Sequence, residues 1–216
     1  SVELEATLAA KGKTQALDMV QQMMRNPGSV MYVRQQEPAG LGHAVWCARH
    51  LAQSEPVAVL LADDLILGTG CLGEMISAYN GGNMVAVMDV PQNETASYGI
   101  VTPGADDGRI VEVNGLVEKP SPKDAPSNIA VVGRYIIEPG VFTHLDRQEQ
   151  GAGGEIQLTD SLARQIGEVS FSGLRFSGER FDCGSKIGFL QANIAFALQR
   201  DELGQHLKSW LAERVK

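Results

Sequence analysis

Short apolar runs of strand length alternate with helical patterns along this chain, and that alternation constrains its fold more than any other feature. The run VAVLL at 57–61 and the run at 84–87 both have the length of a strand. Apolar residues recur at helical spacing at 44–51 and 72–79, before and after the first run. Strands that alternate with helices through short loops indicate βαβ units. We therefore expect an α/β fold with a mostly parallel sheet.

The remaining segments add to this core. A β-rich run at 30–33 predicts a further strand near the front of the chain. Short strands separated by Gly, Asp and Asn at 98–117 predict an antiparallel hairpin inserted beside the sheet, and an extended run at 129–137 follows. Helical periodicity over 187–216 predicts a C-terminal tail of helices.

Length and composition bound the class of protein. A chain of 216 residues is long enough for one large domain or two small ones, and the order of the elements favours one domain over residues 1–216. The net charge of -8 argues against nucleic-acid partners, because phosphates would repel it. Three cysteines without CxxC spacing indicate reduced thiols. With no apolar stretch of membrane-spanning length and no signal peptide, we expect a cytoplasmic protein without a membrane partner.

Two neighbouring aspartates interrupt an otherwise apolar segment. Asp63 and Asp64 follow the run at 57–61 directly, and ligands bind beyond the carboxyl ends of strands in open parallel sheets. Asp182 lies in a second segment of this kind, between an extended run and a helix. The alternative for each aspartate is a cap on a turn or a helix, a common place for Asp. Two aspartates at strand ends would suit Mg²⁺, which prefers oxygen ligands.

Two further segments contain residues that suit ligand binding, and each also has a purely structural explanation. The turn at 35–43 has glycines that allow close approach of a planar ligand, and Gln35 offers a donor and an acceptor to a base edge. A plain strand-to-helix loop is the alternative, and His43 receives no role. Glu118 and Lys119 end a strand before a proline; they suit a sugar hydroxyl and a phosphate, or form an exposed ion pair.

In order along the chain, GLGHAV, LLADDLI, YGIV, VEKP, PSNIAVVGRYI, GAGGEIQLTD and FDCGSKIGFLQA closely resemble the bacterial UTP:glucose-1-phosphate uridylyltransferases, or UDP-glucose pyrophosphorylases. The resemblance covers essentially the whole chain. It implies the nucleotide-diphospho-sugar transferase fold, a Rossmann-like mixed sheet with helices on both sides. It also implies a nucleotidyltransferase that moves UMP from UTP to glucose 1-phosphate with Mg²⁺, giving UDP-glucose and pyrophosphate.

The resemblance assigns roles to individual residues of this chain. Asp63 and Asp182 would be the metal-binding carboxylates, with Asp63 also at the nucleotide. Lys119 would face the sugar phosphate, and Lys186 would be another phosphate ligand.

The base and the sugar receive their own residues from the same motifs. Gln35 and Gly40 would recognise uracil. Gly99 of YGIV and Glu118 of VEKP would hold the glucose hydroxyls. The resemblance further suggests a homo-oligomer.

The chain departs from the family in one respect. The family begins with a strand and a Gly-rich loop of the form GxGTRxLPxTK around the nucleotide phosphates, and this sequence has no such stretch. We therefore expect a fragment without its N-terminal nucleotide-binding strand–loop unit, of at least about 30 residues. Such a fragment would itself be nearly inactive, whereas its full-length parent would catalyse the reaction.

Three other functions fit parts of the sequence. A nucleotidyltransferase for another base or sugar, such as a thymidylyltransferase, is the nearest one. A metal-dependent glycosyltransferase also places aspartates at a strand end, but in a DxD pattern that this chain does not have. A non-catalytic binding module is the third.

Overall fold

The computed structural model describes residues 2–214, and the chain divides into two compact units, one ending at Arg34 and one starting at Gln35. The first unit contains helices α1 (Val2–Ala10) and α2 (Thr14–Met23), which contact each other. The second unit contains every strand and all later helices. The single domain predicted for residues 1–216 thus divides into a small helical unit and a large α/β unit.

A six-stranded sheet forms the centre of the larger unit, in the order β1-β6-β3-β7-β5-β4. Its strands are β1 (Val57–Leu60), β3 (Asn83–Asp89), β4 (Gly99–Asp106), β5 (Ile110–Glu118), β6 (Ile129–Ile137) and β7 (Phe171–Arg175). A separate two-stranded sheet pairs β2 (Asp64–Leu67) with β8 (Glu179–Asp182). The apolar run of β6 is buried over almost its whole length because it lies between other strands and under helices on both faces.

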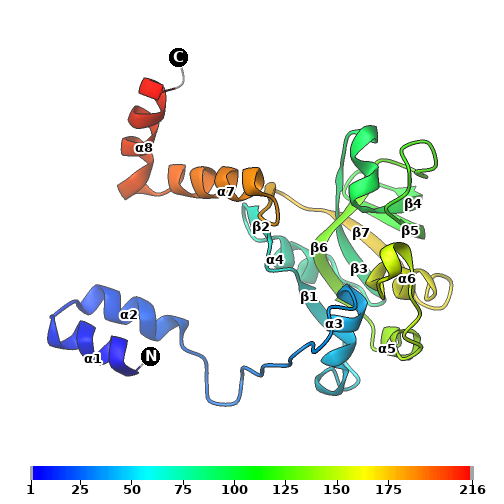
Figure 1. Ribbon diagram of the computed structural model, residues 1–216, viewed down its shortest axis with the longest axis horizontal. Helices are drawn as coiled ribbons and strands as arrows, with labels where there is room; N and C mark the ends of the chain where they lie inside the picture. Colours follow the sequence, from blue (N-terminus) through cyan, green and yellow to red (C-terminus); the bar gives the residue numbers. More distant parts are fainter. Residues whose placement is uncertain (1, 215–216) are drawn as a thin grey trace. The chain divides into compact units, whose positions relative to one another are not determined.

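Helices cover both faces of the large sheet, which gives three layers (Figure 1). One face packs Val85, Val101 and neighbouring side chains against α3 (Leu41–Cys47), α5 (Val141–Leu145) and α6 (Leu158–Ala163). The other face packs Met84 and Ile136 against α4 (Cys71–Ala78). Helices α7 (Lys186–Leu198) and α8 (Asp201–Arg214) follow β8, and short 3-10 helices lie at Arg49–Leu51, Gln92–Ser97 and Ala152–Gly154.

The α/β class, the mixed sheet, the β4–β5 hairpin and the helical C-terminal tail are confirmed, but the expectation of mostly parallel pairing is wrong. Among the described strands only β3 and β7 pair in parallel. Strand β6 lies between β1 and β3 and runs antiparallel to both, so the central pairings of the sheet are antiparallel. The hairpin also belongs to the main sheet, because β5 pairs with β7.

The strand expected at 30–33 is absent from the described part of the chain. Tyr32, in the middle of this run, is 95% exposed. A β-rich composition forms a strand only when another strand is available to pair with it, so local propensity alone was misleading here.

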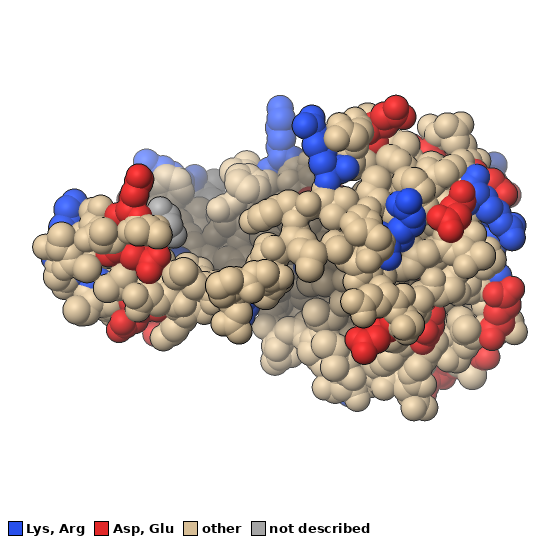
Figure 2. Space-filling view, turned by 90° about the horizontal axis from the view of Figure 1, so that it is seen from below, with Lys and Arg blue, Asp and Glu red and all other residues tan. Residues whose placement is uncertain are grey.

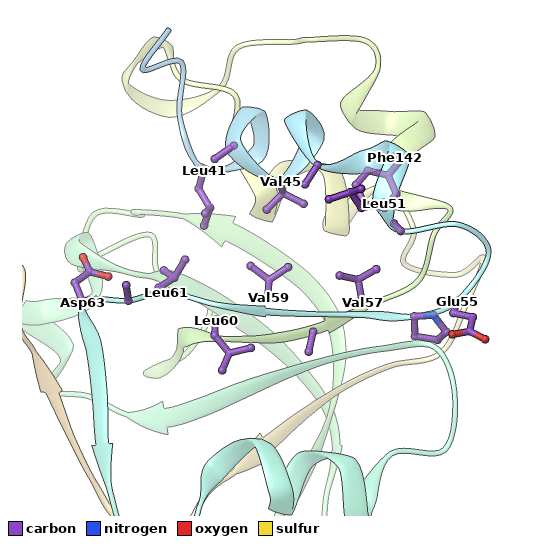
Figure 3. A pocket seen from close by; sticks show the side chains of 16 residues that line it. Leu41, Val45, Leu51, Glu55, Val57, Val59, Leu60, Leu61, Asp63 and Phe142 are labelled. Atoms are coloured by element: carbon purple, nitrogen blue, oxygen red, sulfur yellow. The ribbon is translucent and has the colours of Figure 1, made fainter. Parts of the chain in front are cut away.

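Strand β1 is the edge of the large sheet, and its one partner among the described strands is β6. An apolar groove of about 720 Å³ lies between this strand and the helical segment 41–52. Figure 3 shows Val57, Val59 and Leu61 of the strand side facing Val45 and other apolar side chains of the helical side. Native proteins usually cover or charge such an edge, and this groove carries almost no charge.

No helix in residues 2–214 is long and apolar enough to cross a membrane. The cysteines Cys47, Cys71 and Cys183 are all free thiols, and burial raises the pKa of the Cys71 thiol to about 11.

Acidic and basic side chains are interspersed on the face of the molecule in Figure 2. Any strong electrostatic field for an anionic ligand is therefore local.

Candidate active site

Asp63 and Asp182, far apart in the sequence, lie close together at the small sheet. Strands β2 and β8 pair antiparallel with Asp64 opposite Asp182, so Asp63 lies just before β2 beside the end of β8. The amide of Cys183 donates to the backbone oxygen of Asp63 at 2.8 Å. A Cβ on Gly184 would lie 3.0 Å from Asp182 Oδ1 and 3.3 Å from Asp63 Oδ2. Both carboxylates therefore border the same small space.

The turn after β8 leaves the Asp182 carboxylate available. Ser185, and not Asp182, is the N-cap of α7, because its hydroxyl accepts from the amide of Gly188 at 3.0 Å. Ser185 Oγ also donates to the backbone oxygen of Asp182 at 3.0 Å. Asp182 Oδ1 accepts one bond, from the Gly184 amide at 3.0 Å. Lys186 is exposed at the first position of α7, directly after this turn.

Asp64 is the buried member of the aspartate pair, with only 5% of its surface exposed. Its carboxylate accepts from the amide of Gly133 at 2.7 Å and forms an ion pair with Arg180. Burial lowers the pKa of Arg180, but Asp64, Tyr98 and Asp182 together outweigh burial, so the net pKa is raised. A buried carboxylate is tolerated only when it is paired and hydrogen-bonded, and both conditions hold here. Asp64 therefore holds the structure while Asp63 faces outward.

The side chain of Arg180 connects Asp64 to Tyr98, the residue just before β4. Its Nη1 donates to the hydroxyl of Tyr98 at 3.1 Å, and its guanidinium lies 5.4 Å from the centre of the Tyr98 ring. Tyr98 precedes Gly99, and its backbone oxygen accepts from the amide of Lys119 at 2.9 Å. The two carboxylates and the predicted sugar residues are thus parts of one connected site.

Gly99 and Glu118 lie opposite each other on the paired strands β4 and β5. A Cβ on Gly99 would lie 3.2 Å from Glu118 Oε2 and 3.3 Å from Thr159 Cγ2, so glycine keeps this space open. Lys119 Nζ lies 3.7 Å from Glu118 Oε1; the Lys119 side chain is half exposed, but that of Glu118 is only 11% exposed, so this is not the fully exposed ion pair considered from the sequence. Burial raises the pKa of the neighbouring Tyr135, and the carboxylates of Glu118 and Asp64 raise it further.

The loop that contains Gln35 and Gly40 lies against the Gly-rich segment before α6. The amide of Ile156 donates to the oxygen of Ala39 at 2.8 Å, and Ile156 oxygen accepts from the amide of Gly42 at 2.8 Å. Gly40 has φ +106°, and a Cβ there would lie 2.8 Å from the oxygen of Ile156. Only glycine suits this conformation and this close approach.

The segment 156–159 therefore joins the two ends of the site. Ile156 holds the Gln35–Gly40 loop, and Thr159, three residues later, lies against Gly99. Thr159 is 7% exposed, and the sequence did not mark it or Arg180 as a site residue. The motif GAGGEIQLTD contained Thr159, but nothing in the sequence alone showed which of its side chains meets Gly99.

The apolar groove beside β1 is distinct from this polar site. Of the predicted site residues only Asp63 lines the groove, at one end (Figure 3). A groove lined mainly by Ala, Val and Leu side chains offers no groups for phosphates, so size alone would identify the wrong cavity.

The chain matches known proteins over nearly all of its length. Residues 7–197 match the family described as nucleotidyl transferase. A UTP–glucose-1-phosphate uridylyltransferase of Komagataeibacter xylinus is 50% identical over 190 residues, which cover 87% of this chain and 67% of that protein.

Solved structures give the same result for the fold. The structure described as UTP-bound UGPase from Acinetobacter baumannii has a TM-score of 0.88 and 37% identity, covering 100% of this chain and 76% of that chain. A crystal structure of UDP-glucose pyrophosphorylase complexed with UDP-glucose has a TM-score of 0.75 and 38% identity. The match to the latter covers 79% of this chain and 66% of that one, so the chain spans just under two thirds of that relative.

Replacing Arg180 by leucine should strongly destabilise the larger unit. Arg180→Leu leaves the buried Asp64 carboxylate unpaired, at an expected cost of about 3–5 kcal/mol in the free energy of unfolding. Arg109→Leu is the control, because Arg109 is mostly exposed and pairs with Glu74 at 3.7 Å; it should cost less than about 1 kcal/mol. Urea unfolding measures both, and equal losses would contradict a special role for the buried pair.

Two glycine substitutions test the turn that holds Asp182. A Cβ on Gly188 would lie 2.0 Å from the backbone oxygen of Asp182, whereas a Cβ on Gly73 in α4 would meet nothing within 4 Å. Gly188→Ala should lower the free energy of unfolding by about 1–3 kcal/mol. Gly73→Ala should raise it by roughly 0.5–1 kcal/mol. Thermal or urea unfolding of both variants tests whether the two changes in the free energy of unfolding have opposite signs.

Proposed function

The chain belongs to the nucleotidyl transferase family, and from this membership we propose that its site serves the transfer of UMP from UTP to glucose 1-phosphate. The products are UDP-glucose and pyrophosphate. The observation that carries the proposal is the meeting of Asp63 and Asp182 at Gly184, next to the Asp64–Arg180 pair, whose arginine reaches Tyr98 beside Gly99. The UTP and UDP-glucose of the solved relatives support these ligands for this chain.

Asp63 and Asp182 fit a Mg²⁺ ion. Both present carboxylate oxygens to one space, and oxygen is the ligand that Mg²⁺ prefers. The described residues contain no group of three or more His, Cys, Asp and Glu side chains that could hold a metal. A site with two carboxylates leaves room for substrate phosphates, as is usual for Mg²⁺. When bound, the ion would neutralise phosphate charge and polarise the α-phosphate.

The chemistry requires little acid–base help from the protein. A phosphate oxygen of glucose 1-phosphate attacks the α-phosphorus of UTP in line, and the bond from that phosphorus to pyrophosphate breaks. The attacking oxygen is already anionic, so no general base is needed. The protein must bring two anions together and hold them in line, which Lys119 and Lys186 favour by placing positive charge at the phosphates.

The substrates would be held from the two ends of the connected site. Glu118 and the open space at Gly99 would bind glucose hydroxyls, and Thr159 lines the same space. Gln35 and Gly40 would bind uracil at the other end of the segment 156–159. A thymidylyltransferase is the alternative considered from the sequence, and a panel of nucleoside triphosphates separates the two activities.

Replacing Asp182 by asparagine tests the carboxylate pair. Asp182→Asn should weaken Mg²⁺-dependent binding of UDP-glucose by about ten- to a hundredfold, the range of one charge-assisted contact of ~1.5–3 kcal/mol. Isothermal titration with and without Mg²⁺ measures this, and pyrophosphate release from UTP and glucose 1-phosphate measures turnover. Asp18→Asn, at an exposed position of α2, is the control.

Two results would argue against the assignment. If Asp182→Asn binds UDP-glucose in Mg²⁺ with unchanged affinity, the Asp182 carboxylate is not a ligand of the metal. Failure of the unchanged chain to bind UDP-glucose at any Mg²⁺ concentration would favour a different function, including a binding module.

We also propose that copies of this chain associate through α7. Ile187, Phe189 and Leu190 all have more than half of their surface exposed, which is unusual for three large apolar side chains on one turn. A helix that is apolar all round is normally buried. A second copy of the same helix would cover these side chains.

Charges on α7 should reduce this association. Phe189→Glu with Leu190→Glu is expected to shift the protein to a smaller species in sedimentation velocity at micromolar concentration. Ile76→Glu, at a similarly exposed apolar position on α4, should leave the distribution unchanged. If the unchanged protein already sediments as a monomer at this concentration, the proposal is refuted.

A further inference from the structure

The imidazole of His43, to which the sequence assigned no role, lies against the amide of Gln35. Gln35 Nε2 is 3.0 Å from His43 Nδ1 and 3.0 Å from the backbone oxygen of Gly40. Both residues are partly buried: Gln35 lies in the loop held by Ile156, and His43 lies in the first turn of α3. The amide nitrogen therefore has two neighbours, and their chemistry decides how both side chains are oriented.

The backbone oxygen of Gly40 fixes the orientation of the amide. A carbonyl oxygen only accepts hydrogen bonds, so the Gln35 atom that faces it must be the nitrogen. The second hydrogen of that nitrogen points to His43 Nδ1, which must then be unprotonated. His43 is therefore the neutral tautomer with its hydrogen on Nε2, which lies 3.9 Å from the weak acceptor Cys47 Sγ.

The ring of His43 is held in this position by its other neighbours. It stacks on Trp46 with the ring centres 5.6 Å apart and the planes at 21°. Trp46 in turn donates from Nε1 to Asp146 Oδ1 at 2.6 Å, and the guanidinium of Arg49 lies 3.7 Å from its ring centre. The acceptor at Nδ1 thus has a fixed place relative to α3 and α5.

With both hydrogens of the amide nitrogen engaged, the free end of Gln35 is its oxygen, Oε1. No hydrogen bond among the described residues uses Oε1. A free acceptor suits a base with an N–H group at N3, such as uracil. The N3 of cytosine carries a lone pair instead and would face Oε1 without a hydrogen. Sites built for one hydrogen bond reject analogues that leave it unmade.

We propose that His43 is a positioning residue that holds Gln35 with its acceptor toward the base, and so selects uracil over cytosine. The proposal rests on the proposed function, in which Gln35 binds the base. His43 itself does not touch the nucleotide. Without the His43 acceptor, only the Gly40 oxygen still holds the amide of Gln35. The amide then turns more readily to offer a donor to cytosine.

The test compares the binding of UDP-glucose and CDP-glucose by isothermal titration in Mg²⁺. The two ligands share the sugar and phosphates, so the ratio of their dissociation constants reports on the base alone. His43→Leu should reduce this ratio by about tenfold, the effect of one hydrogen bond. His43→Asn, whose amide oxygen can accept in place of Nδ1, should retain most of the ratio, and the exposed His50→Leu should not change it.

Two further measurements separate the possible failures. Nitrogen NMR of the chain without ligand should show His43, identified by the loss of its signals in His43→Asn, with hydrogen on Nε2 only. Hydrogen on Nδ1, or a ratio unchanged in a folded His43→Leu that still binds UDP-glucose, would overturn the role of His43. If the unchanged chain binds neither ligand, the proposed function fails and base selection fails with it.

Discussion

The buried ion pair between Asp64 and Arg180 is the interaction on which the rest of the site depends. A carboxylate with 5% exposure is costly unless it is paired, and here one guanidinium and the amide of Gly133 satisfy it. The pair joins β2 to β8 and keeps Asp64 opposite Asp182. That register brings Asp63 beside Asp182, and the guanidinium of Arg180 also reaches the hydroxyl of Tyr98, the residue before Gly99. Of the two adjacent aspartates, Asp64 is buried in an ion pair, and Asp63 is exposed beside Asp182.

Close backbone approach is the second constraint, and it explains why the motifs contain glycine. At Gly40 the loop lies directly against Ile156, and at Gly99 the open space lies between Glu118 and Thr159. The Gln35–Gly40 loop and the space at Gly99, proposed to bind the base and the sugar, are separated along the chain but joined through the segment 156–159. A site built in this way responds as a unit, because moving α6 would shift both ends.

The sequence predicted many of the elements, and its errors have physical causes. Helical and strand periodicity placed α3, α4, the C-terminal helices and β1, β3 and β6 within a few residues, because burial of one face imposes that periodicity. Strand direction was predicted wrongly, since a central strand like β6 reads the same in either direction. The strand expected at 30–33 failed because propensity does not supply a partner. Arg180 and Thr159 were missed because their importance lies in contacts across the fold.

What the sequence determined by itself is the set of chemical groups: two aspartates after an apolar strand, a third before a helix, and an ordered series of motifs typical of nucleotidyltransferases. Only the tertiary structure decided which aspartate is buried and which faces the site. Adjacent residues at a strand end point to opposite sides, so one carboxylate must turn inward. The cost of that buried charge is offset by an arginine 116 positions further along the chain, which no local pattern could identify.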